Sequence, residues 1–144
     1  MKKHFFLLLL SMFTVVACAD SNSVPITFEQ LPNEAQTFVQ KHFPSIQIDY
    51  VLMEEGWNTE YEVRLSNSTK LEFNQHGDIR QVDCEYGFVP ESILLTPIKS
   101  YLKKHFPNTN VTEYHAERKV IKVELNTGLE LIFNAQGGFL RMDD

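Results

Sequence analysis

The chain has 144 residues, a formal charge of −6 at pH 7 and an ordinary composition of 43% hydrophobic, 12% aromatic and 22% charged residues. These values exclude a largely disordered chain and a collagen-like fibre. Two cysteines cannot build the disulfide framework of a small secreted scaffold. We therefore expect one domain, or two small units that share a core.

The first 19 residues have the pattern of an export signal. Lys2 and Lys3 precede an apolar run at 5–17, which is shorter than the roughly 20 residues that span a bilayer. Two cleavage sites fit the sequence that follows. A lipoprotein cut before Cys18 would leave a lipid on that cysteine, whereas an ordinary cut after Ala19 would leave no anchor.

The exported chain is expected to be acidic. Loss of Lys2 and Lys3 leaves 11 basic residues against 19 acidic ones, so its charge becomes −8. That charge argues against nucleic acid as a partner, and against the membrane except through a lipid anchor. We predict a tether at 20–27 and an exported protein, either periplasmic or attached to the outer membrane as a lipoprotein.

Two motifs occur twice along the chain. Lys-His-Phe-Pro stands at 41–44 and again at 104–107, an offset of 63. Leu-x-Phe-Asn-x-x-Gly stands at 71–77 and again at 131–137, an offset of 60. A three-residue deletion between the motifs explains the change of offset. Because shared internal order indicates duplication of one unit, we predict repeat 1 at 28–86 and repeat 2 at 87–144.

Each repeat is expected to begin with a helix. In repeat 1, Pro32 suits a first helical turn and Pro44 ends the helix. In repeat 2, a short turn at 90–95 should precede a helix from about 97 to 105. The offset between Pro32 and Pro90 is only 58, which predicts an insertion at the start of repeat 2.

After each helix, the apolar period changes from 3.6 to 2, which indicates four strands joined by short turns. The expected fold class is α+β. Two tandem helix–four-strand meanders would form one antiparallel sheet of about eight strands, with the helices on one face. The other face would be polar and open to a partner.

The sequence shows no constellation for catalysis. The histidines after the signal are scattered and have no cysteine partner nearby, and no G-x-S-x-G motif is present. We therefore expect no enzyme, no metal site and no cofactor.

Ten residues are candidates for a binding surface. Trp57, in the first hairpin loop, either contacts a partner or packs back on the sheet edge. Alternation places nine others on the uncovered face: Glu60, Glu62, Arg64, Lys70, Glu72, Lys122, Glu124, Glu130 and Ile132. Such mixed charge suits either a protein partner or plain solvent.

Four aromatic residues and one cysteine have structural interpretations. Tyr50 and Tyr114, in corresponding strands, are expected in the core, and so is Cys84. Two further residues, Tyr86 and Phe88, lie between the repeats, where they either seal the junction or line a cleft.

The order helix, His-Phe-Pro, four strands and Phe-Asn-x-x-Gly, present twice after an export signal, resembles the PepSY-like, β-lactamase-inhibitor-like family of exported bacterial domains. The resemblance implies the fold and a style of binding. The β-lactamase inhibitory protein, with the same two-unit layout, binds an enzyme across its open sheet face, and PepSY domains restrain peptidases.

The expected function is that of a non-catalytic exported protein. It would bind a protein or peptide through the open sheet face and the loops, with inhibition by occlusion as one mode of action. The alternative is a small-ligand carrier with a pocket at the repeat junction.

Overall fold

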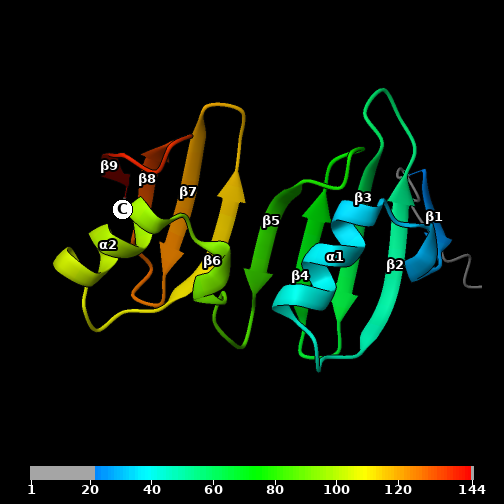
Figure 1. Ribbon diagram of the computed structural model, residues 1–144, viewed down its shortest axis with the longest axis horizontal. Helices are drawn as coiled ribbons and strands as arrows, with labels where there is room; N and C mark the ends of the chain where they lie inside the picture. Colours follow the sequence, from blue (N-terminus) through cyan, green and yellow to red (C-terminus); the bar gives the residue numbers. More distant parts are fainter. Residues whose placement is uncertain (1–21, 144) are drawn as a thin grey trace, which may run out of the picture.

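The computed structural model describes residues 22–143. Nine strands form one antiparallel sheet in which each strand pairs with the next along the chain, and two ten-residue helices accompany it (Figure 1). The predicted α+β class and the single antiparallel sheet are confirmed. The predicted signal at 1–19, with Cys18, lies outside the described residues.

The same order of elements occurs twice. The first half comprises β1 (Ser23–Ile26), η1 (Phe28–Gln30), α1 (Asn33–His42), β2 (Ile48–Glu54), β3 (Glu60–Leu65), β4 (Thr69–Phe73) and β5 (Ile79–Cys84). The second half comprises η2 (Glu91–Ile93), α2 (Thr96–His105), β6 (Val111–Ala116), β7 (Val120–Leu125), β8 (Glu130–Asn134) and β9 (Phe139–Asp143). The connection between β2 and β3 is longer than the connection between β6 and β7. The three-residue deletion therefore lies in the β6–β7 hairpin of the second half.

The strand β1 was not predicted, so the sheet has nine strands rather than about eight. Val24 pairs with Met53 and Ile26 with Val51, so that β1 covers the backbone groups along β2 and becomes the edge of the sheet. Pro25 interrupts the short alternation of this segment, and proline is tolerated in an edge strand. Part of the tether predicted at 20–27 is therefore the edge of the sheet.

The insertion predicted at the start of the second half is wrong. The helices α1 and α2 begin at Asn33 and Thr96, an offset of 63, and the strands β2 and β6 keep the same offset. The residue equivalent to Pro32 is thus Leu95, and Pro90 instead precedes the 3₁₀ turn η2.

A row of buried side chains crosses the sheet and marks its core face. The row consists of paired residues from β2 to β8: Val51, Val63, Leu71, Val82, Tyr114, Val123 and Leu131. Phe73 and Phe133 lie two residues beyond row members, so they share this face.

Each helix contacts one of these two rings. The ring centroids of Phe38 in α1 and Phe73 lie 5.6 Å apart, and those of Tyr101 in α2 and Phe133 lie 5.5 Å apart, both edge-on. The rings that α1 and α2 contact therefore point to the same side of the sheet.

Tyr50 does not pack in the core as predicted. A β-bulge between Ile48 and Tyr50 reverses the alternation, so that Val51 joins the core row and Tyr50 lies on the opposite face, 40% exposed. Tyr114 is buried as predicted, because β6 carries the same bulge after Val111 and Tyr114 stands at the position that corresponds to Val51 in the core row.

The repeated Phe-Asn-x-x-Gly motif forms the β4–β5 and β8–β9 turns. In the first turn, Asn74 Oδ1 accepts hydrogen bonds from the backbone N–H groups of His76 and Asp78, each at 2.9 Å. Gly77 has a φ of +88°, and a Cβ atom there would lie 2.8 Å from the backbone nitrogen of Ala35 in α1. The motif glycine therefore permits both a left-handed turn and the close approach of the helix.

We predict that Gly77→Ala lowers the free energy of unfolding by about 2–4 kcal/mol, since left-handed strain of roughly 1–2 kcal/mol adds to overpacking against α1. The matched control is Gly128→Ala, where φ is +84° but no atom lies within 4 Å of the added Cβ, so only the strain applies. Urea denaturation of both variants measures the difference. Equal losses would show that the helix contact is unimportant.

Candidate functional site

The face of the sheet opposite the core row, here called the polar face, carries nine of the ten candidate residues. Cross-strand pairing aligns two rows on it. One row, from β3 to β9, contains Glu62, Glu72, Gln81, His115, Lys122, Ile132 and Arg141. The other contains Arg64, Lys70, Asp83, Glu113, Glu124, Glu130 and Asp143. Glu60 shares the face because it stands two residues before Glu62.

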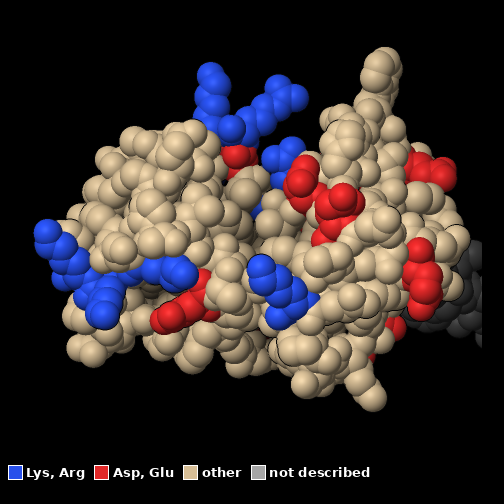
Figure 2. All heavy atoms as spheres, viewed as in Figure 1, with Lys and Arg blue, Asp and Glu red and all other residues tan. Residues whose placement is uncertain are grey.

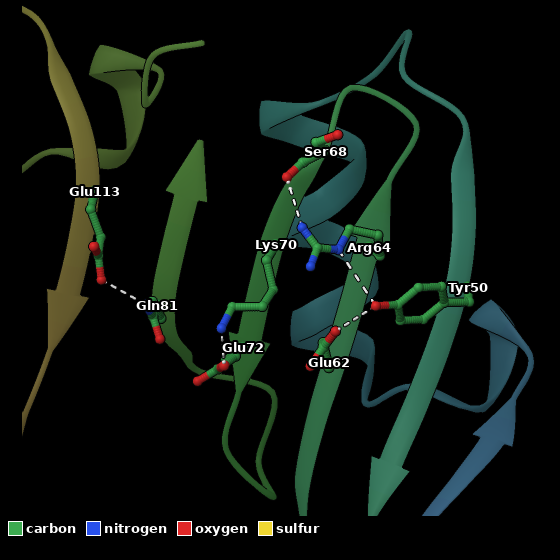
Figure 3. A network of polar contacts seen from close by, with 8 residues as sticks. All are labelled: Tyr50, Glu62, Arg64, Ser68, Lys70, Glu72, Gln81 and Glu113. Carbon is green, nitrogen blue, oxygen red and sulfur yellow. Dashed lines mark hydrogen bonds and ion pairs between the residues drawn. The ribbon is translucent and has the colours of Figure 1, made fainter. Parts of the chain in front are cut away.

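In the first half of the polar face, charged side chains pair with neighbours (Figure 3). Lys70 Nζ lies 2.9 Å from Glu72 Oε1, and this hydrogen-bonded pairing raises the pKa of Lys70. Tyr50 donates its hydroxyl to Glu62 Oε1 at 2.9 Å, and Arg64 donates Nη1 to the carbonyl of Ser68 at 2.9 Å. Most of the charge on this half is therefore locally compensated.

From β5, the last strand of the first half, to β9 at the end of the second half, five acidic residues follow one another across the sheet. This acidic row consists of Asp83, Glu113, Glu124, Glu130 and Asp143. Like charges placed directly opposite each other in a sheet are destabilising. Within residues 22–143, Asp143 pairs with Arg141, but the three glutamates of the row form no ion pair. The acidic row is therefore the least compensated part of the polar face.

The surroundings of Glu113 in the acidic row change the pKa of its carboxyl group. Partial burial raises its pKa, and the charge of Asp83 raises it further, while a hydrogen bond from Gln81 opposes the shift. The bond joins Gln81 Nε2 to Glu113 Oε1 at 2.6 Å across the β5–β6 pairing (Figure 3).

A shallow hollow of about 450 Å³ lies beside three residues of the acidic row. Four carboxyl groups line it, those of Asp83, Glu85, Glu113 and Glu124, together with the β7–β8 turn. A lysine or arginine side chain of a partner would find several acceptors there and could form charge-assisted hydrogen bonds.

The remaining candidate residues differ in how far their side chains are exposed. Trp57 is fully exposed in the β2–β3 loop, so it does not pack back on the sheet edge. Ile132, although on the polar face, is 1% exposed and offers no contact surface. Tyr86 and Phe88 are 80% and 54% exposed, so neither seals the junction.

Sequence reasoning missed Asp83, Glu113 and Asp143, which complete the acidic row. Alternation within β5 could have placed Asp83 on the polar face, because its neighbour Val82 is buried on the core face. Glu113 was harder to place, because a β-bulge after Val111 shifts the pairing of β6.

Two other kinds of feature are absent from the described part of the chain. No group of three or more histidine, cysteine, aspartate or glutamate side chains within residues 22–143 is arranged to hold a metal ion. No helix in that range is long and apolar enough to cross a membrane. Cys84 is buried as predicted, and burial raises the pKa of its thiol.

A family model described as beta-lactamase-inhibitor-like, PepSY-like matches the chain twice, over residues 17–81 and 59–141. The chain belongs to this family. The double match corresponds to two tandem copies of the family domain, as the repeated motifs predicted. Among curated proteins, none matches the chain.

Three solved structures are similar to this member of the family. A candidate periplasmic protein of the DUF2874 family from Bacteroides vulgatus is 32% identical, with a TM-score of 0.82 over 88% of this chain and 99% of the other. A candidate calcium-regulated periplasmic protein from Bacteroides thetaiotaomicron is 29% identical, with a TM-score of 0.81 over 85% and 97%. A third, a candidate periplasmic protein of unknown function from Bacteroides vulgatus, is 30% identical, with a TM-score of 0.79 over 85% and 99%.

We predict that Glu113→Gln stabilises the protein at pH 7. The folded-state pKa of Glu113 is raised, so the folded protein binds its proton more tightly than the unfolded chain does. Its contribution to stability is therefore lost as the pH rises above the unfolded pKa of about 4.3. The gain from glutamine should be present at pH 7 and absent at pH 3.5, in urea titrations at both values. A gain of equal size at the two pH values would contradict this assignment.

Proposed function

We propose that this protein is a non-catalytic periplasmic binding protein that engages a basic segment of another protein through the acidic row. The periplasmic location is supported by the three similar structures, all of which carry that description. Occlusion of the partner, the mode suggested by the inhibitor-like description of the family, would be the mechanism.

The arrangement of the helices supports the polar face as the contact surface. Both helices contact rings that project from the core face, so we infer that they cover that face alone. An antiparallel sheet can leave its other face to solvent, and a partner can then dock there without displacing any part of the protein.

The observation that carries the proposal is the uncompensated charge of the acidic row. Adjacent strands lie about 4.8 Å apart, so five residues in one row extend for roughly 19 Å. The four like-charge pairs along this row reduce stability, and a cationic partner would remove that cost on binding. An extended segment with several lysine or arginine residues fits this length and charge.

A photo-crosslinking experiment in the native host tests the proposal. A benzophenone amino acid replaces Thr127, which is exposed and lines the hollow beside the acidic row. Irradiation should yield one discrete protein adduct whose linked peptide is rich in lysine or arginine. The double variant Glu124→Lys/Glu130→Lys should lose that adduct.

The matched control is Glu29→Lys/Glu34→Lys, which makes the same change of charge at two exposed residues of the first half, one in η1 and one in α1. This variant should keep the adduct. The proposal fails if the adduct survives charge reversal of the acidic row, or if Thr127 yields no adduct while the protein is folded and exported.

Attachment of lipid at Cys18 belongs to the same proposal, because it would hold the binding face near the membrane. Cells supplied with labelled palmitate should label the wild-type chain, and Cys18→Ala should abolish the label. An unlabelled wild-type chain of the length expected for cleavage after Ala19 would establish the freely diffusing form.

A further inference from the structure

A groove of about 550 Å³ lies between α2 and the segment that joins the two halves. This volume is within the range of sites that hold small organic ligands, about 300–1,000 Å³. Its floor is apolar and consists of Val89, Leu94, Leu102, Phe106 and Val111. The groove lies on the helix side of the sheet, so it shares no residue with the acidic row.

The first half of the protein provides an internal comparison, since positions 26–48 correspond to 89–111 at a constant offset of 63. Two apolar residues that pack against the core in the first half, Phe28 and Ile46, are replaced in the groove by Glu91 and Thr109. Removal of these apolar side chains opens the space. The phenylalanine that directly follows each helix differs in the same direction: Phe43 is buried at 5%, whereas its counterpart Phe106 is partly exposed.

The helix position that borders the groove has also changed. In the first half, Gln36 donates Nε2 to the carbonyls of Glu29 and Leu31, at 3.2 and 2.9 Å, and thereby ties η1 to α1. The equivalent residue in α2 is Lys99. One turn later, Gln40 is replaced by Lys103.

Both lysines line the groove, and within residues 22–143 neither forms an ion pair. Basic side chains gather over α2 in Figure 2, although the whole chain is acidic. Glu91 is the acidic side chain of the lining, which leaves the groove with one net positive charge. An apolar floor with two free ammonium groups at its rim is complementary to an amphipathic anion.

We propose that this groove binds a small carboxylate with an apolar body. The carboxylate would lie between the ammonium groups of Lys99 and Lys103, and the hydrocarbon or aromatic body would cover Leu102 and Phe106. Burial of that body supplies most of the affinity, and the two lysines select for negative charge. This inference is independent of the proposed partner on the polar face.

Isothermal titration calorimetry with decanoate, below its micellar concentration, tests the proposal on the full exported chain. We expect one decanoate per protein and at least tenfold weaker binding of decyltrimethylammonium, which has the same chain length and the opposite charge. The variant Lys99→Gln/Lys103→Gln restores the residues of the first half and should weaken decanoate binding about fivefold.

Two further variants separate the groove from the general charge of the surface. Lys104→Gln/Lys119→Gln removes two exposed lysines that do not line the groove and should leave decanoate binding unchanged. Glu91→Phe/Thr109→Ile should close the groove and abolish binding, with circular dichroism as the check of folding. Failure of decanoate to bind, equal binding of the cationic analogue, or equal losses in the two lysine double variants would overturn the proposal.

Discussion

The short pairing between β5 and β6 is the interaction on which the rest of the structure depends. It contains three residue pairs, whereas β7 and β8 share five. At its centre, Val82 and Tyr114 are almost fully buried and continue the core row from one half to the other. Each half has about 60 residues and would be marginally stable alone, so this apolar pair converts two marginal units into one core.

The same pairing explains why charge and stability conflict at the centre of the sheet. Next to the apolar pair, Asp83 faces Glu113 across the strands, and partial burial there raises the pKa of the glutamate. On the helix side, His42 Nδ1 lies 2.8 Å from Ser92 Oγ, which connects the end of α1 to η2. The union of the two halves thus depends on a few contacts, and a partner that neutralised the acidic row would strengthen it.

The sequence predicted those features that depend on local pattern. The His-Phe-Pro motifs marked both helix ends, and alternation located eight of the nine strands, because each signal lies within one element. The strand β1 escaped notice because it exists only through its pairing with β2. The exposed position of Tyr50 depends on a β-bulge, whose location is set by the pairing of two strands and not by the alternation of one.

The candidate sites were only partly predictable, because they too depend on how the strands pair and not only on the pattern within one strand. Alternation placed the nine charged and apolar candidates on one face, but the order of charges across the strands required the register. The groove beside α2 had a readable signal, since Glu91 and Thr109 stand where the first copy has Phe28 and Ile46. Recognising the groove required the correct alignment of the two copies at the start of the second half.

Both unusual features, the acidic row and the groove, lie mainly in the second copy. In the first copy, most charges of the polar face are paired and apolar side chains fill the space beside the helix. We infer that the second copy departs from this arrangement where a ligand or partner would make contact.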